Sequence, residues 1–268
     1  MKIQIVFSDI DGTFITRDHK ITEKTSAAVK SLLSKKIPFV LVSARMPEAI
    51  YPITEKIGVK IPIISYSGGL VLTEDEKILY DKKILAEDTE KVLQEISARW
   101  SDVTVNYYSS RKWFVKDVSD KRVIHEMDNT SATAENANFE NLLEKNILPN
   151  KILVITEPPI CEEMERELGK KFENLNVVRS SKNLLEIMDK TVTKAKGIEV
   201  LLKHYNFSAE NSIAFGDNYN DVEMLKFVGC GVAMGNAPDD VKKIAKEITT
   251  SNEEDGIYNF LVQKNLIS

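Results

Sequence analysis

Two aspartates, Asp9 and Asp11, directly follow a short apolar run and are separated by one residue. Because side chains on an extended segment alternate, both carboxylates can point toward one region just beyond the strand. Paired carboxylates suit a hard divalent cation. Gly12 gives the backbone the freedom to turn sharply next to an anion. The pattern favours a site for a metal and an anion, although a solvated loop with helix-capping aspartates also fits these residues alone.

A second acidic cluster spans residues 216–221 and follows the apolar run Ile213–Phe215. We expect Asp217 to complete the oxygen shell of the cation, and Asn220 and Asp221 to orient waters or a lysine. This set suits Mg²⁺, which keeps several waters and takes only a few protein oxygens. Viewed alone, the segment equally fits an Asn/Asp turn that caps a helix at Val222.

A hydroxyl and an ammonium group lie between the two acidic clusters in the sequence. Ser43 ends the apolar run Val40–Val42, and Lys194 opens a helical pattern behind Thr193. On opposite sides of a phosphoryl group, they would neutralise the charge on its equatorial oxygens. Taken singly, Ser43 is more typical of a strand-end hydrogen bonder and Lys194 of a solvated helix residue. Lys196 competes for the role of Lys194, whose spacing from the following Gly197 fits better.

The elements that must position these residues alternate between apolar runs of strand length and helical patterns. That rhythm predicts parallel strands joined by crossover helices, with ligands bound beyond the carboxyl ends of the strands. The expected strands of this core are Ile3–Phe7, Pro38–Val42, Ile61–Ile64, Leu184–Met188, Ser212–Phe215 and Gly231–Met234. The expected helices run through Ala28–Leu33, Glu48–Ile57, Lys194–Tyr205, Val222–Val228 and Asp239–Thr249.

The regular alternation of strand and helix patterns is interrupted between about Ile84 and Ser181, which predicts an inserted α+β domain. Its expected strands are Thr104–Tyr108 and Lys112–Lys116, paired, then Ile152–Thr156 and Val177–Ser180, with helices at Asp88–Trp100 and Cys161–Phe172. The predicted fold class is α/β, with a Rossmann-like parallel-sheet core formed by residues 1–83 and 182–268 and an inserted cap formed by residues 84–181.

Composition limits the partners. The chain has 268 residues, 43% hydrophobic, and a formal net charge of −5. A chain of this length can bury a large core. Its negative net charge offers no positively charged surface for a polyanion, so we expect no nucleic-acid partner. The apolar run at the N-terminus ends at Ser8, well short of a membrane span or an export signal. Cys161 and Cys230 lack a metal or redox spacing, so we expect a cytoplasmic protein.

The short motifs, taken in order, resemble the haloacid dehalogenase superfamily, and specifically its Cof-type sugar-phosphatase branch. The matching segments are Asp9–Thr13 (DIDGT), Val42–Arg45 (VSAR), Thr191–Gly197 (TVTKAKG), Gly216–Asp221 (GDNYND), Ser65–Gly69, Gly231–Ala237 and Asn252–Ile257. The resemblance implies a phosphoric monoester hydrolase that acts on small phosphorylated metabolites and uses Mg²⁺. It also implies a mobile cap between the second and third motifs.

Carried over residue by residue, the resemblance implies that Asp9 is the nucleophile that forms an aspartyl-phosphate. Asp11 would protonate the leaving oxygen and later activate water. Mg²⁺ would be held by Asp9, the backbone carbonyl of Asp11 and Asp217. The expected phosphate-binding residues are Ile10, Ser43, Ala44, Lys194 and Asn220, and the supporting residues are Gly12, Thr13 and Asp221.

Two departures and several alternatives remain open at this point. The family more often has Thr-Gly-Arg where this chain has Ser43-Ala44-Arg45, and Asn-Gly where it has Ser67-Gly68. The first change keeps the hydroxyl, whereas the second leaves a substrate contact at Ser67 in question. A phosphomutase of the same superfamily and a receiver-type signalling module share the same groups. Gly229-Cys230-Gly231 is only a weak sign of a nucleotide-binding loop.

Substrate choice would lie in the inserted domain, where no motif is present. Its aromatic residues are candidates for stacking on a sugar or cofactor ring, but aromatics on paired strands more often pack within a sheet. These residues are Tyr107, Tyr108, Trp113 and Phe114.

Overall fold

The computed structural model describes residues 2–268, which form two compact units. The first unit comprises residues 2–45, Ile50–Tyr80 and Thr193–Ser268. The second comprises Met46–Ala49 and Asp81–Val192. Among the described residues, no helix is both long and apolar enough to cross a bilayer.

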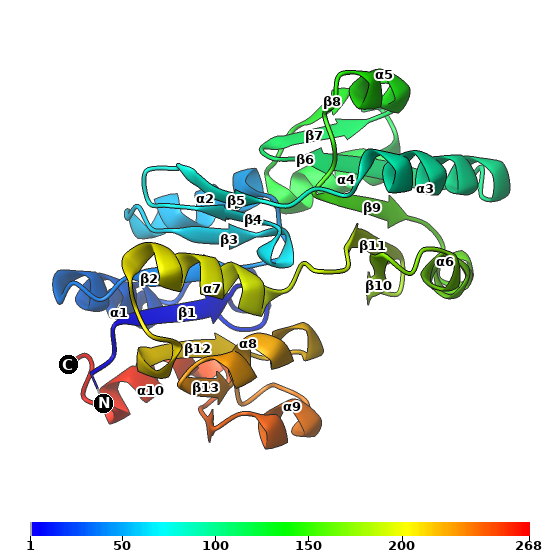
Figure 1. The fold of residues 1–268 in the computed structure, drawn as a ribbon. Coiled ribbons are helices and arrows are strands. Elements are labelled where there is room, and N and C mark those ends of the chain that lie inside the picture. The colour runs from blue at the N-terminus through cyan, green and yellow to red at the C-terminus, as the bar shows by residue number, and fades with distance from the viewer. Residues whose placement is uncertain (1) are drawn as a thin grey trace. The chain divides into compact units, whose positions relative to one another are not determined.

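The first unit is built on an eight-stranded sheet with the order β14-β13-β12-β1-β2-β3-β4-β5 (Figure 1). The five strands β13, β12, β1, β2 and β3 pair in parallel, β14 extends them in parallel, and β4 joins β3 in antiparallel orientation. The strand bounds are β1 Ile5–Asp9, β2 Phe39–Val42, β3 Ile63–Ser65, β4 Leu70–Leu72, β5 Ile78–Asp81, β12 Ser212–Gly216, β13 Cys230–Ala233 and β14 Glu247–Ile248.

The helices of this unit cover both faces of the sheet, which is why its inner strands are buried along their whole length (Figure 1). Helix α1 packs beside α10, and α7 packs beside α8. The helix bounds are α1 Glu23–Ser34, α2 Pro47–Ile57, α7 Lys194–Tyr205, α8 Val222–Phe227, α9 Asp239–Ile244 and α10 Gly256–Gln263. The first residues of α2 group with the second unit.

Local sequence explains where the two best-defined helices begin. The side chain of Thr22 accepts a hydrogen bond from the amide of Thr25 and caps α1. Thr193 does the same for α7, with its hydroxyl accepting from the amide of Lys196 at 3.1 Å. Such caps satisfy amides that the first turn of a helix leaves unpaired. Lys194 is therefore the first residue of a helix whose start is fixed.

Alternation along β1 divides its side chains between the two faces of the sheet. Ile5 and Phe7 belong to the buried cluster that also contains Ile198, Leu201 and other residues of α7 and α8. Because the side-chain period of a strand is two, Asp9 points to the same face as Ile5 and Phe7. The first aspartate of the sequence motif is thus directed toward the helix that begins at Lys194.

The second unit contains a six-stranded sheet with the order β10-β11-β9-β6-β7-β8. All its neighbours are antiparallel except β7 and β8. Its strands are β6 Thr104–Ser109, β7 Lys112–Val115, β8 Ala134–Asn136, β9 Lys151–Ile155, β10 Leu175–Ser181 and β11 Leu184–Asp189. Its helices are α3 Ala86–Arg99, α4 Lys121–Thr130, α5 Phe139–Glu144 and α6 Pro158–Lys171.

The aromatic residues of β6 and β7 pack within this unit on two faces of the sheet. Tyr107 stacks on Phe139 with ring centroids 5.3 Å apart and joins a small core with Phe114. Tyr108 and Trp113, on the other face, stack on each other at 5.4 Å. The sequence-based prediction that β6 and β7 pair is confirmed by their antiparallel register.

The fold class is confirmed, because an α/β chain with a Rossmann-like core and an inserted α+β unit is what the structure contains. Two elements were predicted wrongly. The strand predicted at Leu184–Met188 does not belong to the core sheet, since these residues lie in β11, which pairs with β9 and β10 in the six-stranded sheet. The helix expected over Asp239–Thr249 ends at Ile244, and Glu247–Ile248 form the short edge strand β14.

The second unit also buries an ion pair, which gives a test of its packing. Lys151 Nζ lies 3.4 Å from Glu186 Oε1, and both side chains are about nine-tenths buried. Removing one partner leaves the other charge buried without compensation, so Lys151→Met is expected to lower the free energy of unfolding by about 3–5 kcal/mol. The double variant Lys151→Met/Glu186→Leu is expected to recover most of that loss.

Urea unfolding followed by circular dichroism measures both values. Equal destabilisation by the single and the double variant would show that side-chain packing, and not the uncompensated charge, sets the loss.

Candidate active site

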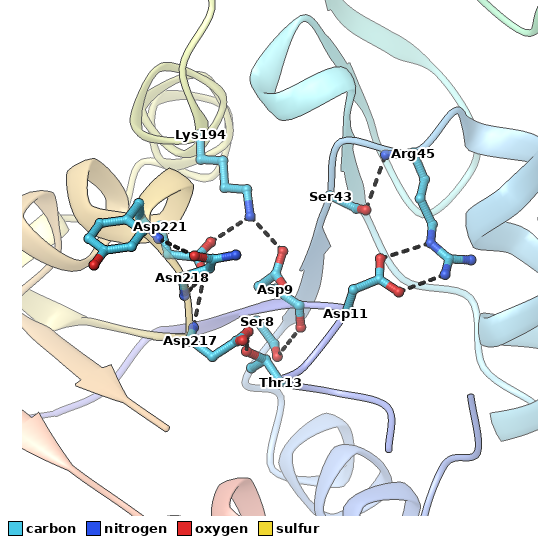
Figure 2. A network of polar contacts seen from close by, with 11 residues as sticks. Ser8, Asp9, Asp11, Thr13, Ser43, Arg45, Lys194, Asp217, Asn218 and Asp221 are labelled. Carbon is cyan, nitrogen blue, oxygen red and sulfur yellow. Dashed lines mark hydrogen bonds and ion pairs between the residues drawn. The ribbon is translucent and has the colours of Figure 1, made fainter. Parts of the chain in front are cut away.

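Three strands of the core end at one edge of the sheet and bring distant residues together. β1 lies between β12 and β2, with Ser8 opposite Phe215 and Asp9 opposite Val42. The residues at and after these strand ends are therefore neighbours, although Asp9 and Asp217 are more than 200 positions apart in sequence. Figure 2 shows Asp9, Ser43 and Asp217 around one region beyond the strands.

Lys194 is the centre of this group. Its side chain is almost completely buried, with 2% exposure, and its Nζ lies 2.5 Å from Asp9 Oδ1 and 2.5 Å from Asp221 Oδ1 (Figure 2). One ammonium group therefore bridges two buried carboxylates. Charge-assisted hydrogen bonds of this kind fix the positions of all three side chains.

Asp221 holds the loop after β12 in shape. Its Oδ2 accepts hydrogen bonds from the amides of Asp217 at 2.9 Å and Asn218 at 3.0 Å. The side chain of Asn218 in turn caps the 3₁₀ turn Tyr219–Asp221. Gly216 permits this close approach, because a Cβ there would lie 2.6 Å from the Cβ of Asp221. Both oxygens of Asp221 are thus engaged by protein donors.

Asp217 is oriented by the loop after β1. Thr13 donates a hydrogen bond from its hydroxyl to Asp217 Oδ1 at 2.6 Å. Gly12 has a φ of +81°, and a Cβ at this position would lie 2.3 Å from Asp217 Oδ2. Glycine is required here both for the left-handed backbone and for the space beside the carboxylate. Asn236 adds a hydrogen bond to the carbonyl of Gly12 at 2.8 Å.

Asp11 points away from the bridged carboxylates. Its side chain is half-exposed and forms a two-point pair with Arg45, at 2.9 Å to Nε and 2.6 Å to Nη2 (Figure 2). The nearby hydroxyl of Ser43 is buried and accepts a hydrogen bond from the amide of Arg45 at 3.1 Å. The hydroxyl hydrogen of Ser43 is therefore free to be donated to another acceptor.

The electrostatics of the group favour added positive charge. Burial raises the pKa of the Asp9 carboxyl, Lys194 lowers it, and Asp221 and Asp217 raise it further, so the net direction is upward. Burial likewise raises the pKa of Asp217 to about 6, against the hydrogen bond from Thr13. Burial lowers the pKa of Lys194, but Asp221 and Asp9 outweigh this and hold it above its usual value. One lysine does not compensate three neighbouring carboxylates.

These carboxylates fit a divalent cation. Asp9, Asp217 and Asp221 each offer an oxygen, and the three oxygens lie within 4.8 Å of one another. Carboxylate oxygens are the ligands that Mg²⁺ takes in proteins. Since Asp221 is already occupied by Lys194 and two amides, Asp9 and Asp217 are the pair that fits direct coordination best.

The structure brings together most of the residues predicted from sequence. Asp9, Thr13, Lys194, Asp217 and Asp221 form one hydrogen-bonded cluster. Gly12, Ser43 and the half-buried Ala44 lie in the loops beside it, and Ile10 is fully buried next to Asp9. Asn220 is exposed and lies outside the hydrogen-bonded cluster. Lys196 pairs on the surface with Glu199 at 2.7 Å, so Lys194 is the lysine beside Asp9.

Two residues of this region had no role in the prediction. Arg45 holds the carboxylate of Asp11, and Asn236 spans the loops that follow β1 and β13. Arg45 is the last residue of the matched segment Val42–Arg45, two positions after Ser43, and this place in the motif was the signal that could have identified it. Asn236 follows the end of β13, at the same edge of the sheet as the other site residues.

The comparison with known proteins identifies the class. Residues 6–261 match the family of haloacid dehalogenase-like hydrolases. A Haemophilus influenzae protein named "Putative phosphatase" is 36% identical over 264 residues, covering 98% of this chain and 99% of its own. A haloacid dehalogenase-like hydrolase from Bacteroides thetaiotaomicron has a similar structure, with a TM-score of 0.87, 26% identity, and coverage of 98% and 99% of the two chains.

A further relative is the 5-amino-6-(5-phospho-D-ribitylamino)uracil phosphatase YitU of Bacillus subtilis, which is 28% identical over 271 residues and covers 97% of each chain. The chain belongs to the haloacid dehalogenase-like hydrolases, in the Cof-type branch that its motifs indicated. It is a phosphatase enzyme of that family. Membership of this hydrolase family disfavours the receiver-type alternative.

The bridging role of Lys194 predicts a large effect on stability. Lys194→Met leaves Asp9 and Asp221 buried without their shared cation, so the free energy of unfolding is expected to fall by about 3–5 kcal/mol. Lys196→Met is the matched control, because Lys196 is exposed and forms a surface ion pair with Glu199, and a change within about 0.5 kcal/mol is expected.

Urea unfolding at neutral pH in the absence of divalent cations measures both variants. Similar values for the two lysines would contradict the compensation of Asp9 and Asp221 by Lys194.

Proposed function

We propose that this enzyme is a Mg²⁺-dependent phosphatase that hydrolyses small phosphorylated metabolites, sugar phosphates among them, through an aspartyl-phosphate on Asp9. The observation that supports the proposal is the position of Asp9, held by Lys194 at 2.5 Å and placed beside Asp217 at the carboxyl ends of parallel strands. Carboxylate, ammonium and a second carboxylate in this arrangement are the groups that phosphoryl transfer requires.

The residues that would hold Mg²⁺ are Asp9, Asp217 and the backbone carbonyl of Asp11. When bound, the ion supplies charge neutralisation that lets a carboxylate approach an anionic phosphate. Asp221 serves as a supporting residue, because its oxygens hold Lys194 and the amides of Asp217 and Asn218. Thr13 and Gly12 support Asp217 from the other side.

The first chemical step is attack of a carboxylate oxygen of Asp9 on phosphorus. The bond between phosphorus and the ester oxygen breaks, and the leaving oxygen takes the proton of the Asp11 carboxyl. Asp11 is half-exposed and pairs with Arg45 in this structure, so it would have to leave Arg45 and take up a proton before it donates to the leaving oxygen. The phosphoryl oxygens would be held by Ser43, the Ala44 amide and Lys194, with Ile10 and Asn220 completing the predicted set.

The second step hydrolyses the intermediate. Asp11, now a carboxylate, takes a proton from a water molecule, and the water oxygen attacks phosphorus. The bond between phosphorus and Asp9 breaks, which releases inorganic phosphate and restores both carboxyl groups to their starting forms. The same residue thus acts as acid and then as base.

The substrate class is supported by a relative and by the architecture. The named substrate of the Bacillus subtilis relative is a phosphorylated ribitylamino compound, which is a small phosphorylated metabolite. We further propose that the inserted unit, expected from sequence over residues 84–181, selects among such substrates. We also propose a cytoplasmic location, because the thiols of Cys161 and Cys230 are free.

Hydrolysis is expected to require Mg²⁺. Chelation should reduce phosphate release by on the order of 100-fold or more, because several kcal/mol of charge stabilisation are lost. Added Mg²⁺ should restore the activity, whereas Ca²⁺ should substitute poorly, since it favours more ligands and looser geometry. Phosphate release from a panel of phosphorylated metabolites, with each metal titrated after chelation, measures both effects.

Full activity after exhaustive chelation would remove the Mg²⁺-dependent mechanism. The same assay separates hydrolysis from the alternative phosphomutase, because a mutase yields a rearranged sugar phosphate in place of free phosphate.

Asp11→Asn tests the acid and base role. An amide neither protonates an alkoxide nor takes a proton from water, so turnover of a sugar phosphate should fall by roughly 10²–10⁴-fold in the first step. With an aryl phosphate, whose phenolate leaves unaided, the first step should largely survive while hydrolysis of the intermediate stays slow. Phosphoenzyme should therefore accumulate with the aryl ester and far less with the sugar phosphate.

Rapid acid quench followed by mass spectrometry detects the phosphoenzyme, with Asp9→Asn as the unlabelled control. Equal slowing on both esters without an accumulating intermediate would leave Asp11 with no role in proton transfer.

A further inference from the structure

Three consecutive residues beside the site adopt left-handed backbone conformations. Tyr66, Ser67 and Gly68, which follow β3, have φ angles of 49°, 54° and 104°. Left-handed backbone is unfavourable for residues that carry a Cβ, and two such residues in succession are uncommon. Tyr66 and Gly68 are buried, and Ser67 is partly buried. Strained backbone of this kind persists only where its surroundings determine it, and it concentrates at functional sites.

One side of this turn holds the segment that carries Ser43. The amide of Ser67 donates to the carbonyl of Ser43 at 2.8 Å, and the amide of Tyr66 donates to the carbonyl of Arg45 at 3.1 Å. The hydroxyl of Ser65 also donates to the carbonyl of Arg45, at 2.5 Å. Both carbonyls are therefore drawn toward the turn, which fixes how the Ser43 hydroxyl and the Ala44 amide are directed.

The other side of the turn touches the start of α7. A Cβ on Gly68 would lie 2.0 Å from the carbonyl oxygen of Thr193 and 3.3 Å from the amide of Gly197. A Cβ on Gly197 would lie 3.1 Å from the Cα of Gly68. The two backbones approach this closely only because both positions are glycine. Thr193 is the N-cap of the helix whose first residue is Lys194.

We propose that the left-handed turn Tyr66–Gly68 is a positioning element that sets the distance between the two phosphate-binding groups, Ser43 and Lys194. It bonds to the backbone around Ser43 on one side and packs against the N-cap of α7 on the other. A tetrahedral phosphoryl group must fit between the hydroxyl and the ammonium, so their separation matters for both phosphate affinity and rate. The inference rests on the proposed function and adds a second role for this loop, independent of any substrate contact by Ser67.

Gly68→Ala tests the proposal. The new methyl group would overlap the backbone carbonyl oxygen of Thr193. That oxygen is part of the main chain and cannot rotate away as a side chain could, so the first turn of α7 must shift. We expect inorganic phosphate to bind at least about tenfold more weakly, because one charge-assisted hydrogen bond is lost or misaligned. We expect kcat/KM to fall by about 100-fold, as for a misplacement near 1 Å. Calorimetric titration with inorganic phosphate in the presence of Mg²⁺ gives the affinity.

Gly58→Ala is the matched control. Gly58 also has a left-handed backbone, with a φ of +75°, but no atom lies within 4 Å of a Cβ placed there. This variant carries the same kind of backbone penalty without a contact to the site. It is expected to lower the melting temperature while leaving phosphate affinity and kcat unchanged.

Ser65→Ala is a milder variant that keeps the proposal testable if Gly68→Ala does not fold. It removes only the hydrogen bond to the Arg45 carbonyl, and a loss of phosphate affinity of about fivefold is expected. If Ser65→Ala, or a folded Gly68→Ala, lowers the melting temperature but keeps native phosphate affinity, the turn has only a structural role and the proposal is overturned.

Failure of the proposed function looks different. If the unmodified protein binds phosphate but hydrolyses no ester, the proposed function is overturned. The phosphate affinities of the variants would then still test the role of the turn. A native chain that binds no phosphate would overturn both.

Discussion

The burial of charge beside Asp9 is the constraint on which the rest of the site depends. A carboxylate taken out of water must be compensated, or its pKa rises until it becomes neutral. Lys194 supplies part of the compensation, but it is shared with Asp221 and has Asp217 nearby. The group is therefore organised and yet short of positive charge. A cluster with this imbalance of charge suits a cation.

The parallel sheet satisfies this constraint without any single segment being chemically unusual. Alternation along β1 directs Asp9 to the face covered by α7, and the cap at Thr193 fixes where that helix starts. Parallel pairing aligns the ends of β12, β1 and β2, so that Asp217 and Ser43 lie beside Asp9. Glycines at positions 12 and 216 then allow the loops to approach the carboxylates closely. Each contribution is local, and only the sheet combines them.

The sequence was sufficient for most of the core and for predicting that most of the candidate site residues lie together, for physical reasons that particular residues show. Asp9, Lys194, Asp217 and Asp221 each follow a strongly patterned strand or begin a capped helix, so their positions followed from topology. β11 was misplaced because Leu184–Met188 is mostly apolar and of strand length, which suits a core strand or an inserted one equally well. Arg45 was missed because a two-point contact with Asp11 depends on loop conformation, which no periodicity encodes. Asn220 matched a motif, yet its side chain is exposed outside the cluster.

The order of the strands has a consequence for how the chain acquires its structure during synthesis. β1 is made first, but one of its two neighbours, β12, begins only at Ser212, after the whole second unit has been translated. Until then, one edge of an apolar central strand has no partner, and such an edge is prone to wrong pairing. The second unit, by contrast, has nearly all its strands and helices within the continuous stretch Asp81–Val192 and can assemble as soon as it leaves the ribosome. During synthesis there is therefore a stage at which the whole second unit has been made, while β12, β13 and β14 of the first unit have not.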